Sequence, residues 1–406
     1  MMPDQIPPEL SSKYLHPVIV IGNSSTNSLG VIRAFGRRGI PVFTISTDSA
    51  RSAMNRSRYV KKQITINSWQ ANDLKEALLS IEARQIAEQY VVFPTTDAAL
   101  LEYSLVRGGL GGSFVDMVPQ RRMVEFCINK NQFYDFCERS NIAHPTSFFL
   151  NGSLPAEVEI RKTKTFPLAV KPVQSHDFSI RFQRKLFVAD SYRELQQLYR
   201  LINSGDPPML LQELITGDNF YMVSFFRANA GKQWAAAGLK KVRQSPTDHG
   251  TGSIVEIYND EKLIERSAEI LEKIGYEGIG EIEFKIDPVS GEAKVLEINA
   301  RSVTFNRLIA LSGLDLEYLY YLASLKLLPE SFVLSAPEKI LRWVDFFKDF
   351  GSALSSWRDN SLTLSEWFRE YRRSDMEGYF AKDDLRPFIV EGRNFLSSGL
   401  RHVFRR

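Results

Sequence analysis

The sequence predicts an α/β and α+β protein in which a doubly wound, parallel-sheet domain comes first and antiparallel strands follow. Two observations support this fold class. Over the first 120 residues short apolar runs alternate with helical patterns, as in parallel βαβ units. From residue 221 the strands become longer and follow one another closely, which is typical of an antiparallel sheet. The 406 residues suffice for two or three domains with substantial cores.

The first domain is expected over residues 1–120. Its strands are short apolar runs bounded by glycine or proline, and its helices carry apolar residues at helical spacing. The expected elements are strand 17–22, helix 29–38, strand 41–45, helix 74–87, strand 90–94 and helix 98–107. This order predicts an open sheet with helices on both faces.

Residues 121–215 are expected to form a helical connection and a small α+β unit with room for a ligand beside its sheet. The helical pattern runs from residue 123 to residue 138, and the turn at 141–145 ends it because proline disfavours a preceding helical residue. The elements expected after this turn are strand 167–171, strand 185–189, helix 191–203 and strand 209–213.

Residues 216–328 are expected to form a larger antiparallel subdomain, and residues 329–406 a helical, aromatic-rich extension. The expected elements of the larger subdomain are strands 221–228, 234–243, 253–258, 280–286 and 294–298, with helix 261–274 between the third and fourth strands. The segment Asp287-Pro288-Val-Ser-Gly291 has the residues of a hairpin turn joining the last two strands.

The composition excludes several classes of protein. Hydrophobic residues make up 44% of the chain and charged residues 24%, as in a folded globular protein. The 51 Lys and Arg nearly balance the 48 Asp and Glu, and we expect no nucleic-acid partner. Cys127 and Cys137 are too few for a disulfide framework and fit two buried thiols of one helical segment. With no apolar leader and no uncharged spanning stretch, these features favour a cytoplasmic location.

Polar side chains cluster on the last two strands of the larger subdomain. Alternation along a strand puts Glu281 and Glu283 on one face, and Glu297, Asn299 and Arg301 on one face of the next strand. Carboxylate and amide oxygens are hard ligands that suit Mg²⁺, which completes its shell with water and nucleotide phosphates. A solvated strand face with alternating polar residues is the equally open alternative.

Two lysines are candidate phosphate contacts. Lys130 stands where a helix begins, and Lys171 closes the apolar strand that starts at residue 167. A lysine ammonium acts as a point charge suited to phosphate oxygens, although most lysines are simply solvated.

The order of these features resembles the ATP-grasp superfamily, and more closely its carboxylate-amine ligases, the group that includes D-aspartate ligase. The resemblance spans residues 17–328. The residues that carry it are Asn129-Lys130, Ile142-Ala-His-Pro145, Pro167-Leu-Ala-Val-Lys171-Pro172, Leu211-Gln-Glu213-Leu-Ile-Thr-Gly217, Lys241-Val-Arg243 with Gly250-Thr-Gly252, Gly280-Glu-Ile-Glu283-Phe284 and Leu296-Glu297-Ile-Asn299-Ala-Arg301. The resemblance implies the ATP-grasp fold with an N-terminal pre-ATP-grasp domain.

The resemblance also implies roles for these residues. Lys130 and Lys171 would contact ATP phosphates, and the adenine-binding hinge would be formed by Glu213 with the backbone of Leu214 and Ile215. The cofactors would be ATP and Mg²⁺, with Mn²⁺ as the alternative metal, held by Glu283, Glu297 and Asn299. Arg301 would face the substrate carboxylate or acyl phosphate, and Arg243 the transferred phosphoryl group, where both would neutralise developing charge. A surface ion-pair role is the alternative for each arginine.

The sequence departs from the family pattern at two places. The segment after Lys171 lacks the glycines that cradle phosphates, and His176 is the substitute donor there, with an ordinary loop histidine as the alternative. Asp218 and Asn219 stand where many relatives place a glutamate for the ribose hydroxyls, and either residue can accept that bond.

The resemblance implies an ATP-dependent ligase that joins a small-molecule carboxylate to an amine through an acyl phosphate and releases ADP and phosphate. The alternatives are a nucleotide-binding scaffold or regulator without catalysis, and a ligase with a different nucleophile. Dehydrogenase and P-loop kinase functions are disfavoured because neither G-x-G-x-x-G nor G-x-x-x-x-G-K-[ST] occurs. In the first domain Asn23, Ser24 and Thr96-Asp97 lie at strand-to-helix turns, where such sheets bind ligands, and a structural turn role is equally open.

The C-terminal residues leave two questions open. Residues 394–406 carry apolar side chains and three arginines, and Arg393 just before them is a fourth. This combination suits either weak contact with an anionic membrane surface or a packed terminal helix. Trp343, Trp357 and Trp367 suit either a cap over the cleft or the face of a homodimer.

Overall fold

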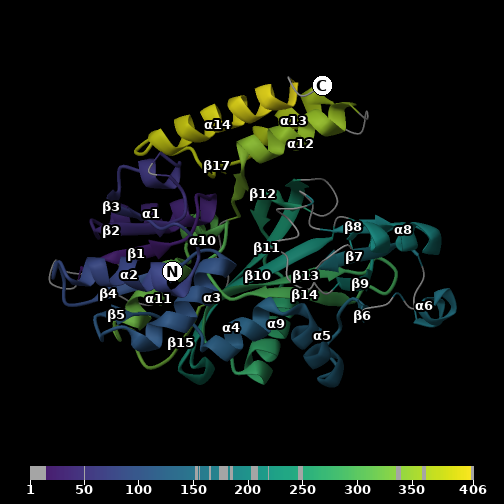
Figure 1. Cartoon of the computed structure of the whole chain (residues 1–406), viewed down its shortest axis with the longest axis horizontal. Helices are drawn as coiled ribbons and strands as arrows, with labels where there is room; N and C mark the ends of the chain where they lie inside the picture. The colour runs from purple at the N-terminus through teal and green to yellow at the C-terminus, as the bar shows by residue number, and fades with distance from the viewer. Residues whose placement is uncertain are drawn as a thin grey trace.

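A computed structural model describes residues 15–49, 51–150, 154, 156–163, 166–172, 182, 186–202, 209–217, 219–245, 250–334, 340–358 and 363–403. Three β-sheets organise this part of the chain (Figure 1). The first residues form a parallel sheet, the middle residues a small antiparallel sheet, and the second half of the chain a large sheet between the other two.

The first sheet is the parallel sheet that the sequence predicts. Its strand order is β3-β2-β1-β4-β5, with all pairs parallel. Its strands are β1 Val18–Ile21, β2 Val42–Ser46, β3 Val60–Thr65, β4 Tyr90–Pro94 and β5 Phe114–Val115, and its helices are α1 Thr26–Arg37, α2 Ala71–Glu82 and α3 Asp97–Val106. The edge strands β3 and β5 were not expected. β3 is half-polar and partly exposed, and β5 has two residues, so neither shows the apolar run that marks a buried strand.

The helical connection is two helices, α4 Arg121–Ile128 and α5 Lys130–Arg139, rather than the single helix expected over residues 123–138. Asn129 breaks the helix because its backbone is extended, with ψ 99°, and its side chain accepts hydrogen bonds from the first backbone amides of α5. Lys130 therefore becomes the first residue of a new helix. Cys127 and Cys137 are both buried, as expected, but lie in different helices.

The small sheet has the order β6-β9-β7-β8, with each pair antiparallel. Its strands are β6 Ser147–Leu150, β7 Leu168–Pro172, β8 Phe187–Ala189 and β9 Met209–Glu213, with helices α6 Glu157–Thr163 and α8 Tyr192–Ile202. The apolar side chains of β7 and β9 pack with Leu195 of α8 in a separate core cluster. This unit therefore packs around a core of its own.

The large sheet has the order β14-β13-β10-β11-β12-β16-β17, with β15 beside β11. Its strands are β10 Phe220–Ala228, β11 Gln233–Ser245, β12 Thr251–Ile257, β13 Gly278–Ile286, β14 Ala293–Asn299, β15 Phe332–Leu334, β16 Arg342–Val344 and β17 Met376–Glu377. Helix α9 Glu261–Ile274 has the predicted bounds because Asp260 caps its start and Gly275, with φ 67°, ends it. The predicted turn Asp287–Gly291 joins β13 to β14.

The C-terminal residues differ from the helical extension that the sequence predicts. Helices α12 Phe346–Arg358, α13 Leu364–Tyr371 and α14 Arg386–Val403 are present, but β15, β16 and β17 join the large sheet. These strands have two or three residues each, too few to show a period. Trp343 and Trp367 are buried within the protein, so neither supplies the dimer face that the sequence left open.

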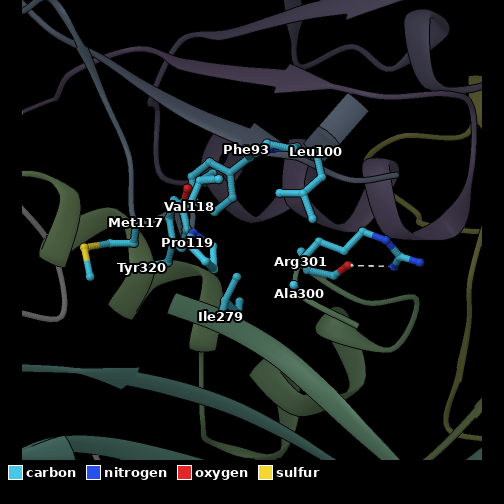
Figure 2. A pocket seen from close by; sticks show the side chains of 11 residues that line it. Phe93, Leu100, Met117, Val118, Pro119, Ile279, Ala300, Arg301 and Tyr320 are labelled. Carbon is cyan, nitrogen blue, oxygen red and sulfur yellow. Dashed lines mark hydrogen bonds between the residues drawn. The ribbon is translucent and has the colours of Figure 1, made fainter. Parts of the chain in front are cut away.

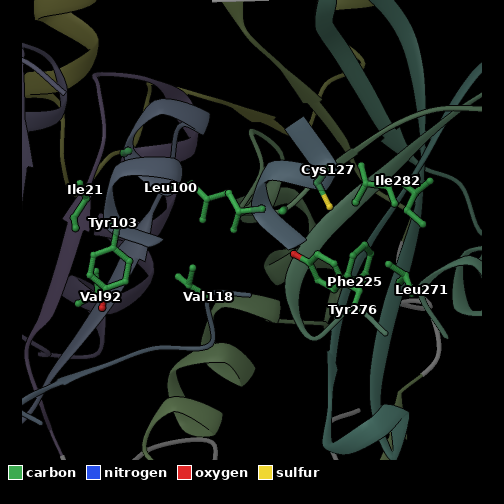
Figure 3. Close-up of a cluster of buried hydrophobic side chains, with 14 of the residues drawn as sticks. Ile21, Val92, Leu100, Tyr103, Val118, Cys127, Phe225, Leu271, Tyr276 and Ile282 are labelled. Carbon is green, nitrogen blue, oxygen red and sulfur yellow. The ribbon is translucent and has the colours of Figure 1, made fainter. Parts of the chain in front are cut away.

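Hydrophobic contacts join the first domain to the large sheet. One buried cluster runs from Val92 and Leu100 through Cys127 to Phe225 and Ile282 (Figure 3). Helices α10 Asn306–Ser312 and α11 Leu316–Ser324, which follow β14, belong to a second cluster with α1. The carboxyl end of β4 lies near the start of β13 and the end of β14, since Phe93 and Pro94 line one cavity with Ile279 and Ala300. No described helix has the length and apolar content to cross a membrane.

A buried polar network lies in the same interface. The hydroxyl of Ser302 donates to Oε1 of Glu317 at 2.7 Å, and Asn27 Nδ2 donates to the Ser302 carbonyl at 2.7 Å. Burial, together with Asp315, raises the pKa of Glu317 to about 8. The carboxyl group is therefore protonated in the folded protein at neutral pH.

This pKa shift predicts that stability falls as pH rises. In the unfolded chain Glu317 ionises near its ordinary pKa of 4.5, so between about pH 5 and about pH 8 the folded state holds one more proton. The free energy of unfolding of the wild type should decrease over this range, and Glu317→Gln should make the decrease shallower by up to about 1.4 kcal/mol per pH unit. Urea unfolding at several pH values measures both slopes. Glu330→Gln, at an exposed site, should leave the slope unchanged; equal slopes for wild type and Glu317→Gln would contradict the prediction.

Candidate active site

Four polar side chains share one face of β13 and β14, as strand alternation predicts. The antiparallel register places Glu281 opposite Asn299 and Glu283 opposite Glu297. Because side chains alternate along each strand, these two pairs point to the same side of the sheet. The hairpin turn before β14 sets this register, and a bulge follows Glu283.

A buried lysine completes this face. Lys241 of β11 lies with its Nζ 2.7 Å from Oε2 of Glu283. Burial by itself would lower the pKa of Lys241, but the neighbouring carboxylates, Glu283 first, raise it above its ordinary value. Sequence reasoning did not select Lys241. Leu239 pairs with Met222, and Met222 pairs with Glu283, so these three side chains face the same side of the sheet. Lys241 lies two residues after Leu239 and therefore faces that side too, which the strand register shows.

Glu281 is the most buried carboxyl of the face, at 3% exposure. Its Oε2 accepts a hydrogen bond from Ser224 Oγ at 2.8 Å. Burial and the adjacent Glu283 raise the pKa of Glu281, because two close carboxylates are costly to ionise together away from water. Positive charge brought to this face therefore has a favourable electrostatic environment.

Arg301 connects this face to the first domain. Its Nε donates to Oδ1 of Asp97, the first residue of α3, at 2.6 Å, and its Nη2 donates to Oδ1 of Asn299 at 3.3 Å. Burial opposes the charged guanidinium, but Asp97 leads the interactions that raise the pKa of Arg301 above its ordinary value. The neighbouring Thr96 caps α3, while Asn23 and Ser24 bond to Asp48 within the first domain.

A small cavity lies beside Arg301 at the carboxyl end of β4 (Figure 2). Phe93, Leu100 and Tyr320 line one part of the cavity, and Ala300 and Arg301, which follow β14, line another part. It has room for about one water molecule. Its place at the strand ends of an open α/β sheet is where such folds bind ligands.

The two candidate phosphate lysines lie in different surroundings. Lys130 Nζ lies 3.4 Å from Oε2 of Glu297. The start of α5 therefore reaches the face of β13 and β14 that carries Glu281, Glu283, Glu297 and Asn299, which we call the carboxylate face. Lys171 of β7 donates from Nζ to Oε1 of Gln212 at 2.5 Å, and the buried Gln212 donates to Ser147 Oγ at 2.9 Å. Lys171 is thus oriented by the small sheet.

The expected hinge follows β9. The carboxylate of Glu213 accepts from Lys294 Nζ at 2.9 Å and from the Thr146 amide at 3.1 Å, which ties the small sheet to β14. Leu214 and Ile215 come next, with Ile215 buried. The carbonyl of Asn219 accepts from the amide of Ile286 at 3.0 Å. His176 and Asp218 lie outside the described residues.

Arg243 is held from the C-terminal helices. Its Nη1 donates to Oδ2 of Asp349 in α12 at 2.8 Å. The register between β11 and β12 shifts on both sides of Arg243. This bulge interrupts the alternation of side chains along β11, so the direction of the Lys241 side chain does not determine that of Arg243. The sequence showed the arginine but not its partner, which is 106 residues away in the chain.

Sequence comparison finds one family match and one curated relative. The family described as "Carbamoyl-phosphate synthase L chain, ATP binding domain" matches residues 254–318, from β12 into α11. Among curated proteins, D-aspartate ligase of Enterococcus faecium (strain Aus0004) is 29% identical over 209 residues, which are 48% of this chain and 49% of that ligase. The match therefore spans about half the length of the curated relative.

Structural comparison covers more of the chain. N5-carboxyaminoimidazole synthetase from Staphylococcus aureus complexed with ADP matches with a TM-score of 0.63 and 11% identity, over 85% of this chain and 86% of that chain. The L-amino acid ligase from Bacillus licheniformis matches with a TM-score of 0.56 and 13% identity, over 77% of this chain and 74% of that chain. The chain has the ATP-grasp fold.

The ATP-grasp fold confirms the fold class expected from the sequence. The carboxylate face also offers the oxygen ligands that a hard cation needs. The described residues contain no group of three or more His, Cys, Asp or Glu side chains arranged to hold a metal. What the face offers is two carboxylates and an amide from Glu283, Glu297 and Asn299. This donor set fits Mg²⁺, which keeps several coordination positions for water and phosphate oxygens.

Proposed function

We propose that this ATP-grasp protein is an ATP-dependent carboxylate-amine ligase that forms an amide bond through an acyl phosphate, with an amino acid as a substrate. The observation that carries the proposal is the convergence of Lys130, Lys241 and Arg301 on the face that bears Glu283, Glu297 and Asn299. Cations and hard oxygen ligands in one place suit phosphoryl transfer, in which catalysis is positioning and charge stabilisation. The names of the relatives, D-aspartate ligase and L-amino acid ligase, support the substrate class.

In this proposal the residues of the large sheet bind the phosphates. Glu283, Glu297 and Asn299 hold Mg²⁺, which supplies charge neutralisation for the transferred phosphoryl group. Lys130 and Lys171 contact phosphate oxygens as point charges. Arg243 faces the transferred phosphoryl, and Arg301 orients the substrate carboxylate beside the cavity at the end of β4.

The nucleotide base lies against the hinge after β9. The backbone of Leu214 and Ile215 pairs with adenine beside Glu213, Asp218 or Asn219 accepts from a ribose hydroxyl, and His176 donates to the phosphates. Residues 121–215 then act as the connection and lid, residues 216–328 as the metal and phosphate subdomain, residues 1–120 as the domain that borders the substrate, and residues 329–406 as the C-terminal part.

The reaction balances as two displacements. An oxygen of the substrate carboxylate attacks the γ-phosphorus of ATP, the bond to the β,γ-bridging oxygen breaks, and ADP leaves with that electron pair. The neutral amine then attacks the acyl carbon, the bond from that carbon to the phosphate oxygen breaks, and phosphate leaves with the electron pair while the proton lost by the amine passes to phosphate or water. Both steps proceed without a nucleophilic side chain, because the enzyme aligns the reactants and excludes water.

ADP release tests the proposal. The protein is incubated with MgATP and free amino acids, including D-aspartate and D-alanine, and small amines, singly and in pairs. We expect one acid and amine pair to stimulate ADP release and to yield an amide detectable by mass spectrometry. Binding of ATP with no stimulation by any pair, or by larger peptide amines, would instead support a nucleotide-binding scaffold. ADP release with a thiol or hydroxyl acceptor and no amide would support the ligase with a different nucleophile.

A further inference from the structure

Asp349 of α12 accepts hydrogen bonds from three separate parts of the chain. Its Oδ2 accepts from Arg243 Nη1 at 2.8 Å and from Trp367 Nε1 at 2.7 Å, and its Oδ1 accepts from Ser253 Oγ at 2.7 Å. Asp349 is fully buried, at 0% exposure. A carboxylate removed from water is stable only when it is paired and hydrogen-bonded, and all three neighbours are donors.

Among the described residues, Arg243 is the only cation that forms an ion pair with Asp349. The ion pair uses Nη1 alone, and within the part of the chain that the structure describes Asp349 is the hydrogen-bond partner of this guanidinium. Because a guanidinium has five N–H donors in a rigid fork, Nε and Nη2 stay available for ligand oxygens while Nη1 is fixed.

The position of Arg243 connects this pair to the carboxylate face. Two residues earlier in β11, Lys241 contacts Glu283. The bulge between Lys241 and Gln244 breaks the alternation, so the strand alone does not determine where the Arg243 side chain points. The direction is supplied by α12, which packs on β11 and β12, and by Trp367 of α13, whose ring lies tilted against that of Phe350 with the centroids 5.1 Å apart.

We propose that Asp349 is a positioning residue, through which the C-terminal helices α12 and α13 orient Arg243 toward the transferred phosphoryl group. The proposal rests on the proposed function. It gives the C-terminal part, which lies beyond the family match at residues 254–318, a role in the reaction. Trp367 shares Oδ2 with Arg243 and holds the carboxylate in place, so the aromatic cluster around α12 supports the anchor.

Asp349→Asn is the main test, because it preserves size while placing an amide where two donors point. We expect kcat for ADP release to fall about tenfold to a hundredfold, with KM for ATP within about twofold, since the lost contact acts through an arginine used in the transition state. The matched control is Asp383→Asn, which removes one carboxylate from the C-terminal part at a surface pair with Arg37. It should keep kcat near the wild-type value.

The double variant Asp349→Asn/Arg243→Ala separates positioning from a merely structural role. If Asp349 acts through Arg243, the double variant should have the kcat of Arg243→Ala alone; additive losses would overturn the proposal. If Asp349→Asn does not fold, Arg243→Lys takes its place, because it keeps the charge but loses the fork. A folded Arg243→Lys protein with wild-type kcat would overturn the proposal, and a loss of about tenfold or more would support it.

Failure of the proposed function gives a different result. Wild-type protein that neither binds ATP by calorimetry nor releases ADP with any pair would overturn both proposals together. Wild-type protein that is active, with Asp349→Asn equally active, would overturn only the role of Asp349.

Discussion

Glu297→Gln is expected to reduce ADP release by at least about a hundredfold without unfolding the protein, since it removes a carboxylate from the proposed Mg²⁺ site that neutralises the transferred phosphoryl group, and the loss of one such preorganised contribution costs this much or more. Glu297 faces Glu283 across the β13 and β14 pair and lies 3.4 Å from Lys130. A glutamine keeps the size and one acceptor oxygen but removes the charge that a divalent cation needs. ADP release with the active acid and amine pair measures the effect, and circular dichroism checks the fold.

The matched control for this variant is Glu292→Gln. Glu292 is an exposed carboxylate of the same hairpin, just before β14, so it tests whether any loss of charge near this strand is sufficient. Its ADP release should equal that of the wild type. A folded Glu297→Gln protein with wild-type turnover would exclude Glu297 from the metal and phosphate site.

Asp384→Ala is expected to lower the free energy of unfolding by about 3–5 kcal/mol, because it leaves a buried charge without its partner. Asp384 lies at 0% side-chain exposure, 3.0 Å from Nε of Arg33 in α1, whose side chain is 1% exposed. The same carboxylate accepts from Ser57 Oγ at 2.7 Å and from the Arg58 amide at 2.9 Å. The C-terminal part is therefore attached to the first domain through a buried ion pair, and urea unfolding measures its strength.

The neighbouring residue provides the control. Asp383 pairs with Arg37 at 2.8 Å on the surface, where its side chain is 39% exposed. The hydrogen bond from Arg37, followed by that from Tyr59, lowers the pKa of Asp383 below its ordinary range, but solvent screens such pairs. Asp383→Ala should cost about 1 kcal/mol or less. Equal losses for Asp383→Ala and Asp384→Ala would show that the buried pair does not anchor the C-terminal part.

The face of β13 and β14 shows how much local pattern can predict. Alternating Glu and Asn residues on two apolar strands, joined by a recognisable turn, predict which side chains face one another, because both the period and the register are local properties. The same holds for α9, whose capping residues lie in the sequence beside it. The order of the segments was sufficient to identify the fold, which the structural comparison confirms.

Residues that reach the site from afar were not predictable in this way. Lys241 was one of many lysines until β10 and β11 placed it against Glu283, and Asp349 was one acidic residue of an amphipathic helix. The strands β15, β16 and β17 are too short to carry a period. Their pairing depends on neighbours up to about a hundred residues away, and no local signal records that choice.

The sequence by itself determined the α/β and α+β class, the elements of the sheets with clear apolar runs, and the polar face of β13 and β14, because these depend on period, turn chemistry and capping within a few residues. Only the tertiary structure decided the charges around that face. It brought Lys130 and Lys241 to the carboxylates, paired Arg301 with Asp97, and set Asp349 behind Arg243. These pairings matter because they are buried, and an unpaired charge removed from water is costly. Packing between elements that are distant in the chain determines which partner lies beside each charge.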